Sequence, residues 1–350
     1  MNLIQHLNKI YDTKSKPFLI YQNTELKFSD IINEKQINLD IVKPGDVVAL
    51  IGDFNASSIS TLLRLIDLKT IIVPLTIETK NTHDYFFESA LVDVVIDDGK
   101  VKQIQQKNHH ILIENLRQKS HAGLILFSTG TTGRPKAILH DMTLFLKRFQ
   151  TPRPTLKMIN FLLFDHIGGI NTLLHTIFNK GIVVAPINRN VDSILKTCAK
   201  YKVEVLPTTP TFLRLMLLSG SVPSKIPNCL KIITYGTERM DQSTLDALCK
   251  LLPNIDFRQT YGMSELGIVR VKSKARNSLY MKIGGEGVET KIDNKVLQIR
   301  SKTRMLGYLN AKSPFDKNGW YDTKDIVDES DGYIKITGRI GDVINVGGLK

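Results

Sequence analysis

Apolar and polar positions along the chain alternate in a pattern that predicts strands separated by helices. A β-branched run at residues 47–51 follows a KPGD turn. Leu62, Leu63 and Ile66 then recur at the spacing of a buried helix face, and the apolar residues 71–73 come next. Strands and helices that alternate in this way are typical of βαβ units in a largely parallel sheet. We therefore expect an α/β fold.

The same pattern continues through the middle of the chain. The apolar runs at residues 123–127, 161–164 and 181–186 predict buried strands. A helix is expected over residues 143–149. These runs extend the sheet, and we assign residues 1–280 to α/β subdomains.

Beyond Met281 the apolar positions follow a period of two. The segments VETKI and KVLQIRS flank Asp293 and Asn294, which predicts two strands joined by a tight two-residue turn. Residues 331–339, DGYIKITGR, predict a further alternating strand. A small antiparallel β subdomain is therefore expected over residues 281–337.

The composition excludes several classes of protein. Hydrophobic residues make up 42% of the chain and charged residues 23%, which is the ordinary globular range. No stretch approaches the roughly 18 consecutive apolar residues of a membrane span. Polar residues interrupt the N-terminal segment, so it lacks the apolar region of a secretory signal. We expect a protein without a membrane span, located in the cytoplasm.

Cysteine usage and charge narrow the chemistry only a little. Cys198, Cys229 and Cys249 have no C-x-x-C spacing, which favours buried thiols in a reducing compartment over a structural zinc site. The net charge of +13 is large, but the basic residues are scattered and lack the aromatic interleaving of a single-strand groove. A lysine-rich solvated surface is the favoured interpretation, and we expect no nucleic acid partner.

Residues 127–136, FSTGTTGRPK, directly follow an apolar run and have the composition of a phosphate cradle. Glycine permits positive φ and close backbone approach, hydroxyl groups add donors, and a lysine adds charge. The residues expected to bind phosphate are Ser128, Thr129, Gly130, Thr131, Thr132, Gly133 and Lys136. The segment is not a Walker loop, which requires Gly, four residues and then Gly-Lys-Ser/Thr. A polar turn is the alternative, and the length of the segment favours a functional site.

This phosphate segment resembles the signature of the adenylate-forming superfamily, which contains acyl- and aryl-CoA synthetases, luciferases and the adenylation domains of peptide synthetases. Five further segments are similar to that family in the same order, so the resemblance spans about residues 26–350. It implies the fold of the family's large N-terminal domain: layered α/β subdomains with mixed, largely parallel sheets plus a small antiparallel β-barrel subdomain. It also implies an enzyme that binds ATP with Mg²⁺.

Two of these segments resemble the parts of the family that meet the acid and the adenine. Residues 165–169, DHIGG, are similar to the mouth of the acid pocket, which makes His166 a gate and a catalytic candidate. The alternative is a structural histidine held by Asp165. Residues 235–238, YGTE, resemble the loop whose glycine backbone lies against the adenine. The residues that this loop would bring to the nucleotide are Gly236, Thr237 and Glu238.

Residues 260–265, TYGMSE, carry the second strong signature. The resemblance assigns Tyr261 to stacking on the adenine, with Gly262 beside it as a further nucleotide contact. It assigns Ser264 to the α-phosphate and Glu265 to Mg²⁺, a hard cation that prefers oxygen ligands. Glu265 is therefore both a metal-ligand and a catalytic candidate. Taken alone, the segment would be a strand end followed by a helix cap at Ser264.

Residues 319–325, GWYDTKD, resemble the family's ribose segment. The resemblance makes Asp325 the acceptor of hydrogen bonds from the ribose hydroxyl groups. Arg339 is implied to contact ribose and phosphate, and it is the third catalytic candidate. In isolation, Asp325 would also fit a solvated surface turn, but Arg339 a short way downstream disfavours that alternative. The single tryptophan, Trp320, is expected to be a packing anchor.

The last residues depart from the family pattern. Family members pivot a C-terminal lid about a residue two positions after this arginine, usually aspartate or lysine, and that residue is Gly341 here. Asp342 follows and is a substitute. The sequence stops at Lys350, so we treat residues 338–350 as a hinge stub and expect the lid, with its adenylation lysine, to be absent. A cut at the hinge, a lid on a separate chain and a degenerate nucleotide binder all stay open, and without the lid we expect weak turnover.

The leading hypothesis is an acid–thiol ligase of the AMP-forming kind. It would convert a small carboxylic acid and ATP to an acyl-adenylate and pass the acyl group to the thiol of CoA or phosphopantetheine. The candidate lining of the acid pocket is mostly apolar or small and consists of Phe164, His166, Thr260, Met263 and Gly267. It favours an aryl or fatty acid. An amino acid met by Asp165 and a non-catalytic nucleotide-binding scaffold are the alternatives, and an acyl carrier protein or a separate lid is the candidate partner.

Overall fold

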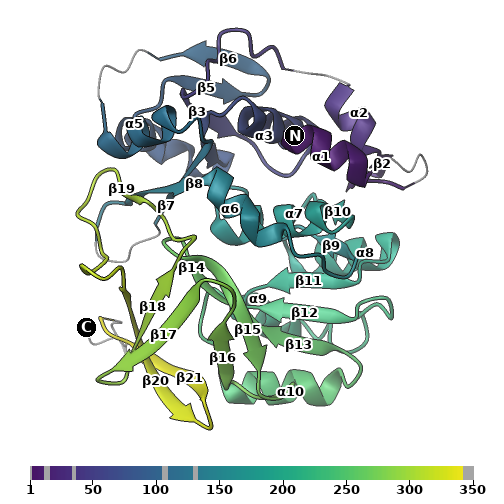
Figure 1. The fold of residues 1–350 in the computed structure, drawn as a ribbon. Coiled ribbons are helices and arrows are strands. Elements are labelled where there is room, and N and C mark those ends of the chain that lie inside the picture. The colour runs from purple at the N-terminus through teal and green to yellow at the C-terminus, as the bar shows by residue number, and fades with distance from the viewer. Residues whose placement is uncertain (1, 12–15, 34–36, 105–108, 129–132, 342–350) are drawn as a thin grey trace.

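The computed structural model describes residues 2–11, 16–33, 37–104, 109–128 and 133–341. The strands form three seven-stranded sheets, with helices packed around them (Figure 1). The first sheet lies at the top of Figure 1, the second at the centre right, and the third at the lower left in green and yellow. The α/β fold predicted from the sequence pattern is confirmed. Within the described ranges, no helix is long and apolar enough to cross a membrane.

The first sheet confirms the expected βαβ units. Its strand order is β19-β8-β7-β4-β3-β5-β6, and β3 pairs in parallel with β4 and β5. The helix α3 (Ala56–Asp67) begins after an Asn55 cap and buries Leu62, Leu63 and Ile66, as their spacing predicts. The strands are β3 (Val47–Ile51), β4 (Ile71–Leu75), β5 (Val94–Asp97), β6 (Lys100–Gln103), β7 (Gly123–Phe127), β8 (Ala137–Asp141) and β19 (Gly307–Tyr308).

The second sheet is parallel except at one edge. Its order is β13-β12-β11-β9-β10-β1-β2, and only the edge pair β1–β2 is antiparallel. The strands are β1 (Leu19–Tyr21), β2 (Thr24–Leu26), β9 (Lys157–Ile159), β10 (Ile182–Val184), β11 (Val205–Thr208), β12 (Ile232–Tyr235) and β13 (Asp256–Gln259). Its helices are α7 (Ile167–Phe178), α8 (Val191–Tyr201), α9 (Pro210–Leu218) and α10 (Gln242–Leu251).

One predicted strand of this sheet is wrong. The apolar residues 161–164 form the loop that leads into α7, and the strand is β9, a few residues earlier. Phe164 is fully buried and packs edge-on against Phe54, with ring centroids 5.2 Å apart. Because the loop is buried, its residues are apolar without being a strand. The helix predicted over residues 143–149 is split into α6 (Met142–Phe145) and the 3₁₀ helix η2 (Leu146–Phe149).

The third sheet is antiparallel, with the order β14-β15-β16-β21-β20-β18-β17. Its strands are β14 (Tyr261–Met263), β15 (Gly267–Ser273), β16 (Met281–Gly284), β17 (Val288–Asp293), β18 (Val296–Ser301), β20 (Tyr321–Ser330) and β21 (Tyr333–Arg339). The sheet includes β14 and β15, which precede the boundary expected at residue 281. The division into residues 1–280, 281–337 and 338–350 stays a prediction. Residues 342–350 lie outside the described residues.

The predicted hairpin is present with its turn one residue later. Asp293 pairs with Val296, so the turn residues are Asn294 and Lys295 rather than Asp293 and Asn294. Both have positive φ, 48° and 65°, which is the backbone geometry of a type I′ turn. The strand expected over residues 331–339 is β21.

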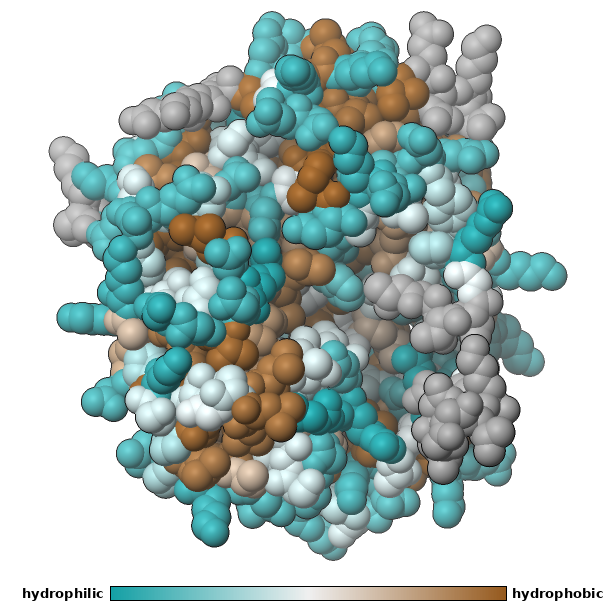
Figure 2. Space-filling model, turned by 180° about the vertical axis from the view of Figure 1, so that it is seen from behind, coloured by the Kyte–Doolittle hydropathy of each residue, from teal (hydrophilic) through white to brown (hydrophobic). Residues whose placement is uncertain are grey.

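The remaining helices pack around the sheets (Figure 1). The rear face of the molecule carries mostly hydrophilic side chains with separate apolar patches (Figure 2). Two exposed apolar residues, Leu215 and Leu218, lie on α9. The remaining helices are α1 (Leu3–Ile10), α2 (Phe28–Asn33), η1 (Ile77–Thr82), α4 (His83–Ala90) and α5 (Ile111–Gln118).

Candidate functional site

The predicted phosphate segment is the connection between the antiparallel strands β7 and β8. The backbone N–H of Ser128 donates to the carbonyl of Lys136 over 3.0 Å, and the N–H of Lys136 donates to Ser128 Oγ, also over 3.0 Å. These two bonds close the base of the connection. A Cβ atom on Gly133 would meet no atom of the described residues within 4 Å. The predicted phosphate ligands Thr129, Gly130, Thr131 and Thr132 lie outside the described residues.

Three side chains from distant segments meet beside this connection, and we call Lys136, Glu265 and Tyr308 the turn cluster. The Lys136 ammonium lies 5.0 Å from the centroid of the Tyr308 ring, and the Tyr308 hydroxyl donates to Glu265 Oε1 over 2.7 Å. Pairing of β19 with β8 brings Tyr308 to this place. Burial raises the pKa of Tyr308, and the Glu265 carboxylate raises it further. The cluster thus unites a cation and a carboxylate at the base of the predicted phosphate segment.

Ser264 and Glu265 lie in the short turn that joins β14 to β15. No helix begins at Ser264, so the alternative of a helix cap there is excluded. The Ser264 carbonyl accepts a hydrogen bond from His140 Nε2 over 2.6 Å, and the Glu265 carbonyl accepts one from the N–H of Met305 over 2.8 Å. Both predicted residues are therefore held by their own backbone carbonyls.

A second group of predicted residues meets on the third sheet, and we call Tyr261, Asp325 and Arg339 the strand cluster. The Tyr261 hydroxyl donates to Asp325 Oδ2 over 2.6 Å. Arg339 Nε lies 3.7 Å from Asp325 Oδ1, and the two residues are register partners on β20 and β21. Asp325 is only 7% exposed, which excludes a solvated surface turn. Burial raises the pKa of Tyr261 well above its usual value, and Asp325 adds to the rise.

The contact between Tyr261 and Asp325 also shows that the third sheet curls. The strands β14 and β20 are separated by β15, β16 and β21 in the strand order. In a flat sheet they would lie roughly 19 Å apart at a strand spacing of about 4.8 Å. A 2.6 Å hydrogen bond between their side chains therefore requires the sheet to close on itself. This curvature agrees with the expected barrel-like subdomain.

The pKa of Tyr321, on β20, is influenced by one residue of each cluster. Burial raises the pKa of its hydroxyl, the Glu265 carboxylate raises it further, and the Arg339 guanidinium lowers it. Tyr321 therefore lies within electrostatic reach of a member of each cluster. Its ring also meets that of Phe315, with centroids 5.7 Å apart.

The predicted adenine loop follows β12 and is tightly packed. A Cβ atom on Gly236 would come within 2.1 Å of Thr260 Oγ1, so glycine is required for this approach. Thr237 has a φ of 70°. The Glu238 carboxylate accepts bonds from the N–H of Thr211 over 3.1 Å and from its hydroxyl over 2.5 Å. Glu238 is thus engaged by the first turn of α9, and its contact with a nucleotide stays a prediction.

The predicted acid gate lies where residues 161–164 enter α7. His166 is the half-buried N-cap residue of α7, and its side chain makes no capping hydrogen bond. Asp165 Oδ2 accepts a bond from the Thr76 hydroxyl over 3.3 Å, while its Oδ1 is buried without a hydrogen-bond partner among the described residues. Burial raises the pKa of Asp165. The side chain of Asp165 thus bonds to Thr76 rather than to His166.

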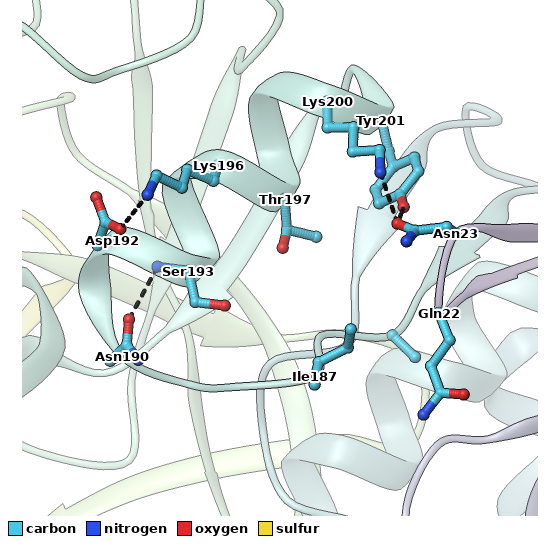
Figure 3. Close-up of a pocket in the computed structure, with 11 residues that line it drawn as sticks. Gln22, Asn23, Ile187, Asn190, Asp192, Ser193, Lys196, Thr197, Lys200 and Tyr201 are labelled. Carbon is cyan, nitrogen blue, oxygen red and sulfur yellow. Dashed lines mark hydrogen bonds and ion pairs between the residues drawn. The ribbon is translucent and has the colours of Figure 1, made fainter.

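A pocket of about 340 Å³ lies elsewhere, between α8 and the β1–β2 turn (Figure 3). Lys200 and Tyr201 both bond to Asn23 Oδ1, and Lys196 pairs with Asp192. None of the predicted site residues lines it. The site is therefore recognised by its side-chain chemistry rather than by this hollow.

Three contributors to the site were not predicted from the sequence: His140, Arg148 and Tyr308. His140 directly follows the apolar residues 137–139, and a polar residue next to such a run is a signal that the sequence offers. The structure buries it in β8. Tyr308 lies in a two-residue strand far along the chain from Glu265. Nothing in the local pattern of either segment predicts that they meet.

The three sheets, with polar side-chain clusters on their strands and on the connections between them, define an α/β protein. The chain belongs to the AMP-binding enzyme family, whose match covers residues 42–300. This confirms the resemblance to the adenylate-forming superfamily.

Curated relatives and solved structures agree with this assignment. The chain is 27% identical over 291 residues to 4-coumarate–CoA ligase 4 of Arabidopsis thaliana, which covers 73% of this chain and 51% of that protein. It is 24% identical over 321 residues to 4-coumarate–CoA ligase 2 of Nicotiana tabacum, covering 80% of this chain and 59% of that protein. The chain spans about half the length of the curated relatives it matches.

The solved structures show the fold. The N-terminal subdomain of Klebsiella oxytoca NpsA in complex with 3-hydroxyanthranilyl-AMSN superposes with a TM-score of 0.78 at 14% identity, covering 96% of this chain and 98% of that one. The anthranilate CoA ligase AuaEII in complex with anthranoyl-AMP gives 0.77 at 17% identity, covering 100% of this chain and 79% of that one. The predicted fold class, that of an adenylate-forming N-terminal domain, is thereby confirmed.

Proposed function

We propose that this protein binds ATP with Mg²⁺ and activates a small carboxylic acid as its acyl-adenylate. The observation that carries the proposal is the pair of contact sets that hold its polar side chains: Tyr308 with Glu265 and Lys136 in the turn cluster, and Asp325 with Tyr261 and Arg339 in the strand cluster. These residues come from four separate segments, and family membership gives that arrangement its chemical meaning. The strand cluster would hold the nucleoside, and the turn cluster would hold the phosphates.

The nucleotide contacts follow from the chemistry of each group. Asp325 offers carboxylate oxygens to the ribose hydroxyl groups, and Arg339 offers donors to ribose and phosphate. Lys136 and the backbone N–H groups of the β7–β8 connection would hold the phosphates. The ring of Tyr261, with Gly262 and residues 236–238, would meet the adenine.

Glu265 suits a magnesium ion that is held mostly by phosphates. Mg²⁺ is usually bound by one or two carboxylates together with substrate phosphate oxygens and water. Among the described residues, no three His, Cys, Asp or Glu side chains gather as a metal site. The proposal does not require such a site, because phosphate oxygens and water would supply the other ligands. Glu265 accepts one hydrogen bond from Tyr308 and retains further lone pairs for a cation.

The reaction needs positioning and charge neutralisation rather than an added base. The substrate carboxylate is already a nucleophile, and its attack on the α-phosphorus expels pyrophosphate. Lys136 would neutralise charge on the phosphates, while Ser264 and Arg339 would orient the α-phosphate. A thiol of CoA, or of phosphopantetheine on an acyl carrier protein, would then take the acyl group. A separate lid domain is the further candidate partner, and the proposed location is the cytoplasm.

An aryl acid is the proposed substrate class, with a fatty acid next. Two of the relatives are named 4-coumarate–CoA ligases, and one similar structure is an anthranilate CoA ligase. The proposed lining is drawn from the predicted set Phe164, His166, Thr260, Met263 and Gly267. Of these, Phe164 packs against Phe54 in the core, and the Arg148 side chain fills the space beside Gly267. An amino acid is the weaker candidate, because burial of Asp165 disfavours the carboxylate charge that an ammonium group would require.

An acid-dependent pyrophosphate–ATP exchange assay tests the proposal. We expect exchange with an aryl acid in the panel, and we expect it to vanish in Glu265→Ala. The exposed Glu289, paired with Arg300 on the neighbouring strand, provides a matched control, and Glu289→Ala should retain exchange. Calorimetric MgATP binding without exchange, even when a relative's lid domain is supplied, would favour a non-catalytic scaffold instead.

A further inference from the structure

We infer that His140 and Arg148 are positioning residues that hold the Ser264–Glu265 turn in register with Lys136. This inference rests on the proposed function and extends it to two residues that make no proposed contact with the nucleotide. We call the pair the carbonyl clamp, because both side chains bind backbone carbonyls of the segment around the turn.

Arg148 supplies most of the bonds of the clamp. Its Nη2 donates to the carbonyls of Leu266 and Thr303 over 2.6 and 2.8 Å. Its Nη1 donates to the carbonyl of Ile268 over 3.2 Å, and its Nε donates to Thr303 Oγ1 over 2.6 Å. Four of the five guanidinium N–H groups are therefore committed to protein oxygens. Burial lowers the pKa of Arg148 to about 10, so the side chain stays charged at neutral pH.

His140 holds the other side of the turn. Its ring is 1% exposed, and Nε2 lies 2.6 Å from the Ser264 carbonyl. A carbonyl only accepts, so Nε2 carries the proton and Nδ1 is the unprotonated nitrogen. Nδ1 is buried and has no hydrogen-bond partner among the described residues. The ring is thus committed to a single bond, and that bond ends on the residue assigned to the α-phosphate.

The two clamp residues and Lys136 belong to one continuous piece of chain. Lys136 directly precedes β8, His140 lies within β8, and Arg148 lies in η2 just beyond it. The carbonyls of Ser264, Leu266 and Ile268 all accept bonds from this piece. The clamp therefore fixes the distance between Lys136 and Glu265 through side-chain hydrogen bonds rather than through backbone pairing of strands.

Gly267 supports this assignment independently of the hydrogen bonds. It has a φ of 72°, and a Cβ atom there would lie 2.2 Å from Arg148 Nη1. The guanidinium therefore occupies the space beside Gly267, a residue assigned from the sequence to the acid pocket. Glycine at this position is explained by the clamp and by the left-handed backbone.

A buried arginine that binds carbonyls can also be a structural staple, and the chain contains a matched example. Arg276 Nε donates to the carbonyl of Ile255 over 2.7 Å, and Nη2 donates to those of Cys249 and Leu252. These carbonyls lie at the end of α10 and just beyond it, where no predicted site residue lies. Arg276→Lys therefore removes a comparable set of hydrogen bonds to backbone carbonyls and leaves the Ser264–Glu265 turn unchanged.

The test compares two ligands in the full chain. Arg148→Lys keeps the charge and loses the planar fork of donors. We expect it to raise the MgATP dissociation constant about tenfold in calorimetry, because charge-assisted hydrogen bonds that hold the turn are lost. The dissociation constant of adenosine, followed by ligand-observed NMR, should change less than about twofold, because none of its proposed contacts belongs to the turn cluster. Arg276→Lys should lower the thermal midpoint and leave both constants unchanged.

A second pair of variants covers the case in which Arg148→Lys does not fold. His140→Leu removes the donor to Ser264, and His140→Gln offers an amide N–H in its place. We expect a several-fold weaker MgATP affinity in the first and recovery of most of it in the second, with adenosine binding unchanged. Equal loss of both ligands, or no loss in either variant, overturns the inference. A wild-type protein that binds neither ligand instead overturns the proposed function, and the inference falls with it.

Discussion

The strand cluster and the turn cluster differ in what places their side chains. Asp325 and Arg339 face each other because they are register partners in a ladder, and Tyr261 reaches them because the sheet curls. In the turn cluster, by contrast, Lys136 and Glu265 lie in connections outside strands. Side-chain bonds from Tyr308, His140 and Arg148 hold these connections.

This difference suggests a division of labour within the proposed site. Ladder hydrogen bonds fix Cα positions closely, which suits recognition of a rigid nucleoside. Turns leave backbone N–H groups free for an anion, which suits a triphosphate. We therefore expect substitutions in the two clusters to separate nucleoside affinity from phosphate affinity.

Removal of the Lys136 ammonium should give the largest effect. Lys136→Ala is expected to lower acid-dependent pyrophosphate exchange about 100- to 1,000-fold, since it deletes a fixed charge beside the reacting phosphate. Adenosine binding, measured by ligand-observed NMR, should persist. Lys200 is the matched control because it also lies over a tyrosine ring, at 5.2 Å, but outside the site. Comparable loss in Lys200→Ala would contradict the role of Lys136.

Neutralisation of the ribose carboxylate should affect the other half of the site. Asp325→Asn is expected to weaken adenosine and AMP binding about 10- to 100-fold, because hydrogen bonds to a charged acceptor become neutral ones. Asp322 lies on the same strand and bonds to Lys324, so Asp322→Asn should leave both affinities unchanged. Unaltered adenosine binding in Asp325→Asn, measured by NMR titration, would remove the strand cluster from the nucleoside site.

Acid should destabilise the protein through buried histidines, one of which belongs to the clamp. Burial lowers the pKa of His140 and of His175 to about 4, whereas an unfolded histidine titrates near 6.5. Between these values the unfolded chain binds the proton and the folded chain does not. The free energy of unfolding is therefore unaffected by these histidines above about pH 6.5. Below that pH it falls by about 1.4 kcal/mol per pH unit for each histidine, down to about pH 4.

Urea unfolding of His140→Gln and His175→Gln between pH 4 and 7 measures these contributions. Each variant should have a shallower pH dependence than the wild-type protein. Only His175→Gln leaves the donor to the Ser264 carbonyl untouched, so its MgATP affinity at pH 7.5 should equal that of the wild type. A pH profile that neither variant alters would mean that other groups govern acid unfolding.

Loss of the Tyr261 hydroxyl should give the smallest effect. Tyr261→Phe keeps the ring for stacking and removes one hydrogen bond to Asp325, which is worth about 1 kcal/mol. We expect adenosine affinity to fall by roughly fivefold and the unfolding free energy to fall by about the same 1 kcal/mol. Calorimetry of MgATP binding should show the same fivefold change. A much larger loss for MgATP than for adenosine would mean that the two clusters are not separable.

Many residues of the candidate site can be predicted from the sequence because they belong to short motifs. The chemistry of Lys136, Glu265 and Asp325 is local, because each residue belongs to a short motif of consecutive residues. The alternation of apolar runs likewise predicts the α/β layers. Prediction failed at residues 161–164, where an apolar run packs between layers as a loop rather than as a strand. It failed by one residue at the β17–β18 turn, because local pattern sets a turn less precisely than ladder register does.

By itself, then, the sequence determined which kinds of side chain stand in which short segments, since apolar periodicity and motif composition are local properties of a chain. Only the tertiary structure decided what those side chains touch. The curl that joins Tyr261 to Asp325, the engagement of Glu238 by α9 and the clamp from Arg148 to Leu266 all join residues far apart in the chain. Such contacts depend on how sheets pack and twist, and no short stretch of residues encodes that arrangement.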